Sequence, residues 1–213
     1  MNQVVETLVL GTGNRHKAQE IQALLADLPL QIHTLADFPD IPEVIEDGDT
    51  CQANAIKKAR ETAMLTGHWT LADDTGLEVK ALGGRPGVYA ARYAGANATY
   101  ADNCRKLLTE MAGISADQRG ARFVTVMALS DPQGNVEVVE GVLSGNITET
   151  FYGSQGFGYD PIFSVAEVGK TLAEMSLTEK NQISHRARAL QQAKELLKCR
   201  LLSASSSGRS AAR

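Results

Sequence analysis

Six consecutive residues near the start of the chain could bind an anion: Thr12, Gly13, Asn14, Arg15, His16 and Lys17. β-Forming residues precede this stretch, and apolar residues recur at helical spacing after it, from Ala18 to Leu28. The pattern predicts a strand, a tight glycine turn and a helix. The helix start offers N–H groups and a positive dipole end, Asn14 adds an amide donor and Lys17 adds a charge. We expect a phosphate site here, although an ordinary strand–helix connection with a surface lysine fits equally well.

A second group of candidates is acidic. Asp73 and Asp74 are expected to close a short buried strand, 69–72. Glu46 comes shortly before the helix that is predicted to begin at Thr50. Adjacent carboxylates repel each other, so they are best tolerated at the surface or beside a cation. Three carboxylates and a substrate phosphate would suit Mg²⁺, which prefers oxygen ligands. The alternative is that the aspartates cap a turn; we favour the metal site.

Lysine and asparagine side chains form a third candidate. Asn54 and Lys58 lie four residues apart on a helix predicted from Thr50 to about Leu65, so they share one face. The pair could reach the phosphates that Lys17 binds. A solvated helix face explains the same spacing.

Two later segments carry aromatic and cationic residues. Phe157 lies between two glycines in 156–163, where it could stack on a base and contribute about 1–3 kcal/mol. Lys180, His185 and Arg186 gather near a predicted helix start, where cations oppose the helix dipole. An anion or a carbonyl-bearing ligand would offset that cost. The alternatives are a core phenylalanine in a glycine-rich loop, and cations paired with acidic residues of the chain.

The secondary-structure elements that position these residues alternate between strand and helix in the first part of the chain, and a β-hairpin follows later. Helices are expected to begin at the capping residues Thr50, Thr99, Ser176 and Ser184. Strands are expected at 123–129 and 136–142, joined by a turn at 131–135, with a further strand near 146–150. This pattern predicts an α/β protein with a mixed central sheet flanked by helices. We expect one domain over 1–202, and a disordered tail or cloning remnant at 203–213.

Composition restricts the class of protein. The 213 residues are 43% hydrophobic and 22% charged, typical of a globular domain, and the net charge of −4 disfavours a nucleic-acid partner. We expect no membrane association, because no apolar run approaches the roughly 18 residues of a membrane span. Cys51, Cys104 and Cys199 are far apart, which predicts reduced thiols in a cytoplasmic protein rather than disulfides or a zinc site.

The order and spacing of six blocks resemble the inosine triphosphate pyrophosphatase family. The blocks are 12–17, 46–59, 72–77, 83–92, 156–163 and 179–186. Three departures occur, because family members often have Phe, Glu and Ser where this chain has Cys51, Ala53 and Thr75. The resemblance implies two lobes with a nucleotide cleft between them. It also implies hydrolysis of deaminated purine nucleoside triphosphates (ITP, dITP, XTP and dXTP) to the monophosphate and pyrophosphate, which keeps these bases out of DNA and RNA.

The resemblance assigns roles to residues. Asp74 would be the catalytic proton acceptor, and Glu46, Asp73 and Asp74 would bind Mg²⁺. The substrate-binding residues would be Thr12, Gly13, Asn14, Arg15, His16, Lys17, Lys58, Thr75, Phe157, Gly158, Tyr159, Asp160, Lys180, His185 and Arg186. His185 and Arg186 would donate to O6 of hypoxanthine or xanthine and would leave the amino group of adenine unpaired. The family commonly forms homodimers, and we expect 83–92 to contribute a contact.

Other functions compete with this one. A non-catalytic nucleotide sensor would not need three intact metal-binding carboxylates. A pyrophosphatase of broader nucleotide preference would share them. A dinucleotide-dependent oxidoreductase is disfavoured, because His16 stands where the third glycine of its fingerprint belongs.

Overall fold

The computed structural model describes residues 5–202, so the tail predicted at 203–213 lies outside the described residues. The chain divides into two compact units. The first unit holds the residues up to Asp74, Val126–Glu140 and those from Ala189 onward, and the second holds Thr75–Thr125 and Gly141–Arg188. Each unit has a hydrophobic core of its own.

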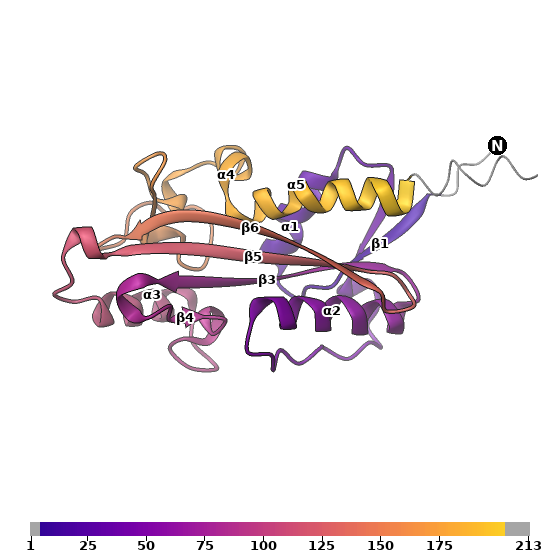
Figure 1. Cartoon of the computed structure of the whole chain (residues 1–213), viewed down its shortest axis with the longest axis horizontal. Coiled ribbons are helices and arrows are strands. Elements are labelled where there is room, and N and C mark those ends of the chain that lie inside the picture. Colours follow the sequence, from indigo (N-terminus) through magenta and orange to yellow (C-terminus); the bar gives the residue numbers. More distant parts are fainter. Residues whose placement is uncertain (1–4, 203–213) are drawn as a thin grey trace, which may run out of the picture. The chain divides into compact units, whose positions relative to one another are not determined.

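The strands form one mixed sheet in the order β2-β1-β3-β5-β6-β7, with β4 paired to β3 (Figure 1). Their bounds are β1 Glu6–Leu10, β2 Leu30–Thr34, β3 Trp69–Val79, β4 Pro86–Gly87, β5 Gly120–Ser130, β6 Val136–Ile147 and β7 Phe163–Val165. β1 pairs in parallel with β2 and β3, whereas β4 pairs antiparallel with β3, and β7 with β6. The predicted α/β class with a mixed sheet is confirmed.

Capping residues start the helices where the sequence predicts. The bounds are α1 Arg15–Leu25, α2 Cys51–Thr66, α3 Tyr100–Glu110, α4 Leu177–Ile183 and α5 His185–Leu197. Thr50, Thr99 and Ser176 accept the expected hydrogen bonds from the first turns of α2, α3 and α4. The Ser184 hydroxyl accepts from the Ala187 N–H at the start of α5. Among the described residues, no helix combines the length and apolar character needed to cross a membrane.

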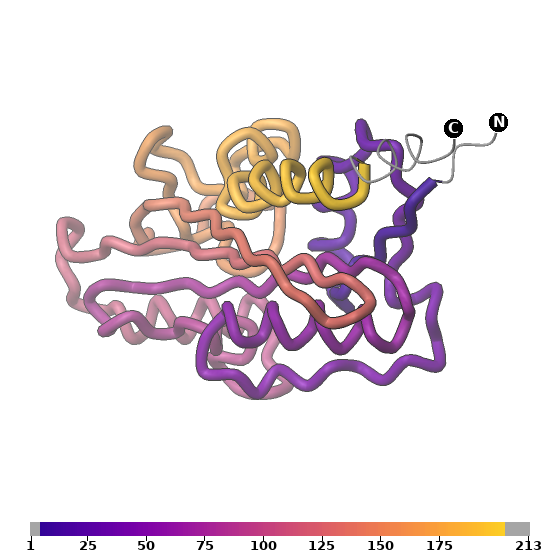
Figure 2. The backbone as a smooth tube through the Cα atoms, turned by 45° about the vertical axis from the view of Figure 1, so that its right-hand side comes forward, coloured from indigo at the N-terminus to yellow at the C-terminus, as the bar shows by residue number. Residues whose placement is uncertain are grey.

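In the first unit, helices cover both faces of the strands. Side chains of α1 and α5 pack with those of β1, β3 and β5 in one cluster that includes Leu8, Leu10, Ile21, Leu25, Leu71, Met127, Leu129, Leu190 and Leu197. α2 lies across the strands from α5 and buries Ala55, Ala59 and Ala63 (Figure 1). The β5–β6 hairpin turn reaches α2, where the Arg60 side chain donates to the Gly134 carbonyl at 3.1 Å (Figure 2).

In the second unit, α3 and the segment around 159–175 pack with β3, β5 and β6. The core includes Leu77, Val79, Leu107, Met111, Phe123, Leu143, Ile147, Ile162, Phe163 and Leu172. The buried Arg119 guanidinium donates to the carbonyls of Met111, Ile114, Ile147 and Thr148. It therefore ties the end of α3 to the end of β6 through buried carbonyls.

Two predictions about strands are wrong, and one strand was not predicted. β3 does not end before Asp73 but runs on to Val79, so both aspartates lie in the middle of a strand. Residues 148–150 form no separate strand, because β6 itself continues to Ile147. β2 was not predicted; its ladder with β1, from the Glu6–Leu30 pair to the Leu10–Thr34 pair, is a tertiary feature.

Candidate active site

The turn between β1 and α1 is organised by its own side chains. The Asn14 side-chain oxygen accepts from the N–H groups of His16 at 3.0 Å and Lys17 at 3.3 Å, and so caps α1. The buried Thr12 hydroxyl accepts from the Asn14 N–H at 3.3 Å. Two N–H groups expected to meet an anion are thus bonded to Asn14. The phosphate predicted at this turn would therefore be attracted by the helix dipole and by the cations Arg15 and Lys17.

The two aspartates of β3 meet different lysines. Successive side chains of a strand point to opposite faces, which separates the two charges. Lys17 Nζ lies 3.1 Å from Asp73 Oδ2, and Asp73 is fully buried. Lys58 Nζ lies 3.9 Å from Asp74 Oδ1 and 2.6 Å from the Asp73 backbone oxygen. Each carboxylate therefore has a different nearest ammonium group, although the Lys58 charge also acts on Asp73 and the Lys17 charge on Asp74.

Glu46 joins Asp73 and Asp74 through Lys58, whose Nζ lies 2.5 Å from Glu46 Oε1. Burial alone would lower the pKa of Lys58, but the negative charges of Asp73, Asp74 and Glu46 outweigh it, and the pKa is raised. Burial also raises the pKa of Asp74, with opposition from the Lys58 and Lys17 charges. A carboxylate with a raised pKa is a stronger proton acceptor than an exposed one.

Asn54 belongs to the same group, although the sequence suggested it as a phosphate contact rather than as a partner of Asp74. Its Nδ2 donates to Asp74 Oδ2 at 3.2 Å, and its oxygen accepts from the Gly48 N–H at 2.8 Å. Only glycine fits at position 48, because a Cβ there would lie 2.7 Å from Asn54 Oδ1. Asn54 thus holds the 46–48 segment beside Asp74. In the sequence, its spacing of four residues from Lys58 indicates that both side chains lie on one face of the helix.

Glu46, Asp73 and Asp74 fit a hard divalent cation in their chemistry, because all three offer carboxylate oxygens and already contact lysine ammonium groups. Within residues 5–202, however, no three acidic, histidine or cysteine side chains are gathered closely enough to hold a metal ion. The carboxylates, as arranged here, are compensated by Lys17 and Lys58. The Mg²⁺ site stays a prediction.

A buried ion pair organises the aromatic loop of the second unit. Asp160 Oδ2 accepts from Lys180 Nζ at 2.7 Å and from the Phe157 N–H at 2.9 Å. Lys180 Nζ lies 4.8 Å from the Phe157 ring centroid, and the Arg186 guanidinium carbon lies 5.5 Å from it. The half-buried ring therefore has cations around it, while the Tyr100 ring lies 5.8 Å away. Cation contacts of this kind stabilise a flat aromatic surface.

Two neighbours of Phe157 support the loop from within. The hydroxyl of buried Tyr159 donates to the Ala90 carbonyl at 2.8 Å, and the Gly158 carbonyl accepts from the Cys104 thiol at 3.3 Å. Both contacts tie the loop to the core of the second unit. The Tyr159 side chain therefore packs in the core of the second unit, and its contact with substrate stays a prediction.

His185 and Arg186, at the start of α5, are both buried, and each forms a hydrogen bond with a threonine hydroxyl. Arg186 Nη2 donates to Thr75 Oγ1 at 3.3 Å, and His185 Nδ1 lies 2.6 Å from Thr125 Oγ1. The two hydroxyl oxygens are 2.8 Å apart. Thr125 was not predicted, because a threonine within an apolar strand carries no signal of its own.

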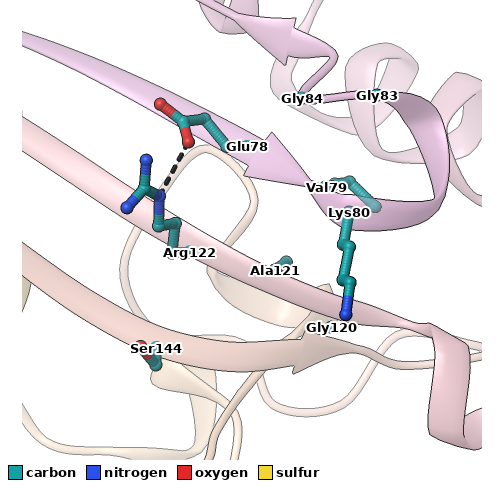
Figure 3. A pocket seen from close by; sticks show the side chains of 9 residues that line it. All are labelled: Glu78, Val79, Lys80, Gly83, Gly84, Gly120, Ala121, Arg122 and Ser144. Atoms are coloured by element: carbon teal, nitrogen blue, oxygen red, sulfur yellow. Dashed lines mark hydrogen bonds and ion pairs between the residues drawn. The ribbon is translucent and has the colours of Figure 1, made fainter.

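A pocket of about 460 Å³ lies elsewhere in the second unit (Figure 3). It is lined by Glu78, Val79, Lys80, Gly83, Gly84, Gly120, Ala121, Arg122 and Ser144. The Arg122 and Glu78 side chains form an ion pair at 2.7 Å within it. It contains none of the predicted catalytic, substrate-binding or metal-binding residues.

The structure thus groups the predicted residues into two sets, one in each unit. The first combines a helix N-terminus, two lysines and three carboxylates, and the second combines an aromatic ring with buried cations. This is the arrangement of a nucleotide-binding α/β protein.

Comparison with known proteins then identifies the family. Residues 8–196 match the model of the Ham1 family. The dITP/XTP pyrophosphatase of Desulfotalea psychrophila is 48% identical over 191 residues, which cover 90% of this chain and 85% of that protein. The dITP/XTP pyrophosphatase of Geobacter sulfurreducens is 49% identical over 183 residues, 86% of this chain and 92% of that protein. This chain belongs to the Ham1 family.

Solved structures agree. A HAM1 protein from Coxiella burnetii has a TM-score of 0.84 at 40% identity, covering 91% of this chain and 99% of that one. The Staphylococcus aureus Ham1 protein has a TM-score of 0.81 at 37% identity, with the same coverage of both chains. The resemblance of the sequence to the inosine triphosphate pyrophosphatases is confirmed.

Proposed function

We propose that this protein is a Mg²⁺-dependent pyrophosphatase that hydrolyses dITP, ITP and XTP to the nucleoside monophosphate and pyrophosphate. The observation that carries the proposal is the buried group of Asp74, Lys58 and Asn54, in a chain whose relatives are dITP/XTP pyrophosphatases. This group supplies a proton acceptor beside a cation. Removing the deaminated nucleotides from the pool keeps them out of DNA and RNA.

Residues of the first unit bind the triphosphate in this proposal. Lys17, Lys58 and the N-terminus of α1 supply positive charge against about four negative charges of the substrate. Glu46, Asp73 and Asp74 would hold Mg²⁺, which when bound would neutralise phosphate charge. The attacking water gives its proton to Asp74, whose pKa is raised by burial. The water oxygen bonds to the α-phosphorus, and the bond between that phosphorus and the departing pyrophosphate breaks.

Residues of the second unit bind the base. Phe157 stacks on the purine, and His185 and Arg186 donate to O6. Asp160 and Lys180 hold the Phe157 loop in place through their buried ion pair. Adenine presents an amino donor where hypoxanthine presents an acceptor, and an unpaired buried donor costs about 1–3 kcal/mol. ATP is therefore a poor substrate.

The proposal extends to assembly and location. We propose a homodimer in which 83–92 contributes to the interface, because Tyr89 in this segment is 51% exposed in the single chain. Gly83 and Gly84 of the same segment line the pocket of Figure 3. The cysteines Cys51, Cys104 and Cys199 are free thiols, which suits a cytoplasmic protein.

A substrate panel tests the function. The purified protein with Mg²⁺ is assayed on ITP, dITP, XTP, GTP and ATP, and the phosphate product is identified. We expect pyrophosphate, with ITP and XTP hydrolysed much faster than ATP and GTP. Release of orthophosphate would contradict the reaction. Equal rates on all five would support the broader pyrophosphatase, and binding without turnover would support the sensor.

A further inference from the structure

Four side chains of the second unit form a continuous chain of hydrogen bonds. It runs from Arg186 to Thr75 at 3.3 Å, from Thr75 to Thr125 at 2.8 Å, and from Thr125 to His185 Nδ1 at 2.6 Å. Thr125 is fully buried, and His185 and Arg186 are nearly so. The chain links β3 and β5 to the start of α5.

One end of this chain has a fixed donor. A guanidinium group only donates, so the Thr75 oxygen is an acceptor toward Arg186. When the Thr75 hydroxyl donates to Thr125 and the Thr125 hydroxyl donates to His185 Nδ1, neutral His185 carries its hydrogen on Nε2. In the opposite direction, His185 would carry its hydrogen on Nδ1, and the Thr75 oxygen would accept from both Arg186 and Thr125.

Packing restricts what else His185 can do. Its ring stacks on Phe123 with centroids 4.5 Å apart and an interplanar angle of 24°. A ring held between that contact and Thr125 has little freedom to turn over, so Thr125 decides which nitrogen carries the hydrogen.

We propose that Thr125 is a positioning residue for base selection. Its hydroxyl fixes the tautomer of His185 and, through Thr75, the orientation of the Arg186 guanidinium. The two base-contacting donors are thereby held ready for a 6-oxo purine. This inference rests on the proposed function, in which His185 and Arg186 donate to O6.

Thr125→Val tests the proposal, because valine keeps the shape of threonine and removes the hydroxyl. We expect the ratio of kcat/KM for ITP to that for ATP to fall about tenfold, the effect of mis-setting one buried donor. Thr125→Ser restores a hydroxyl and should restore the ratio. Thr70→Val is the matched control, since Thr70 is equally buried in β3 but lies in the first unit. An unchanged ratio in Thr125→Val would overturn the proposal.

A spectroscopic readout separates this proposal from a structural role. Long-range ¹H–¹⁵N correlations of the histidine rings, with His185 assigned by a His185→Gln variant, report which nitrogen is protonated. We expect hydrogen on Nε2 in the wild type and a tautomer mixture in Thr125→Val. Hydrogen on Nδ1 in the wild type would overturn the proposal. This measurement on the wild type does not depend on whether any variant folds. A wild type that hydrolyses none of the triphosphates overturns the proposed function instead, while the tautomer still tests the chain.

Discussion

Asp73 and Asp74 show how one residue step along a strand separates two charges. Asp73 faces Lys17, whereas Asp74 faces Lys58 and Asn54. Two carboxylates on one face would repel each other and share a proton, but on opposite faces each has a different nearest cation. This arrangement leaves Asp74 beside Lys58 and Asn54 as the proton acceptor of the proposed reaction, while Asp73 lies against Lys17.

Asp74→Asn should lose about 10²- to 10⁴-fold in kcat on ITP, the usual contribution of a general base. The fold should not weaken. Burial raises the pKa of Asp74 above its unfolded value of 3.8, so the ionised form at neutral pH costs the folded state free energy. The wild type therefore loses stability as the pH rises from 3.8 through the pKa of Asp74 in the folded state, and the neutral amide avoids this cost. Activity assays and Tm at pH 7 check both effects. A Tm well below the wild type would contradict the second.

Lys58→Met should destabilise the protein by about 3 kcal/mol, because Glu46 and Asp74 would lose the cation that compensates them in a buried place. Its neighbour provides the control. Lys57 pairs with Asp47 on the surface, so Lys57→Met should leave the free energy of unfolding unchanged within error. Urea unfolding measures both variants. Equal losses for the two would show that Lys58 does not compensate the buried carboxylates.

At the scale of elements, helix starts are predictable from the sequence and strand ends are not. Thr50, Thr99 and Ser176 mark α2, α3 and α4 correctly because an N-cap bond is local, within three residues. β3 reads as ending at Asp73, since nothing nearby in sequence shows that Lys17 and Lys58 neutralise the aspartates. Strand extent depends on such distant partners.

The loop before Asp160 requires glycine at position 156 for two reasons. Its φ is +74°, and a Cβ there would lie 2.1 Å from Asp160 Oδ2. Gly156→Ala should displace the carboxylate from Lys180 and from the Phe157 N–H. We expect the KM for ITP to rise several-fold as the stacking ring loses its support.

Gly169→Ala is the control for this prediction. Gly169 has nearly the same φ, +71°, but a Cβ there would meet nothing within 4 Å. It should incur only the backbone strain of about 1–2 kcal/mol, with no change in KM. Steady-state kinetics and thermal unfolding of both variants separate strain from displacement. Equal KM values for the two would refute the role of the Asp160 contacts.

At the scale of the molecule, the sequence blocks predict which residues matter better than they predict how those residues act. The α/β class and the family follow from patterns that span 12–186. The contact of Asn54 with Asp74 and the role of Thr125 escape the prediction, because each depends on a partner distant in sequence: Asp74 for Asn54, His185 for Thr125. Tyr159 lies in a predicted block, yet its hydroxyl bonds to Ala90 in the core.

The oligomeric state is a property of the whole molecule, and the proposed homodimer is testable through Tyr89. Tyr89 is 51% exposed in the single chain, and the Arg92 guanidinium lies 5.1 Å from its ring centroid. Aromatic residues and arginine are enriched in protein interfaces, and isolated charges are depleted there. Tyr89→Glu would place an unpaired charge in the proposed interface and should shift the sedimentation mass from twice 22.8 kDa to 22.8 kDa.

Tyr152→Glu should leave the mass unchanged, because Tyr152 is similarly exposed, at 48%, but lies outside 83–92. Sedimentation velocity at several concentrations distinguishes a weakened dimer from an unfolded chain, since unfolding would broaden the boundary and lower the helical circular dichroism. A wild type that sediments as a monomer would contradict the dimer. A Tyr89→Glu variant that stays dimeric would instead move the interface away from this segment.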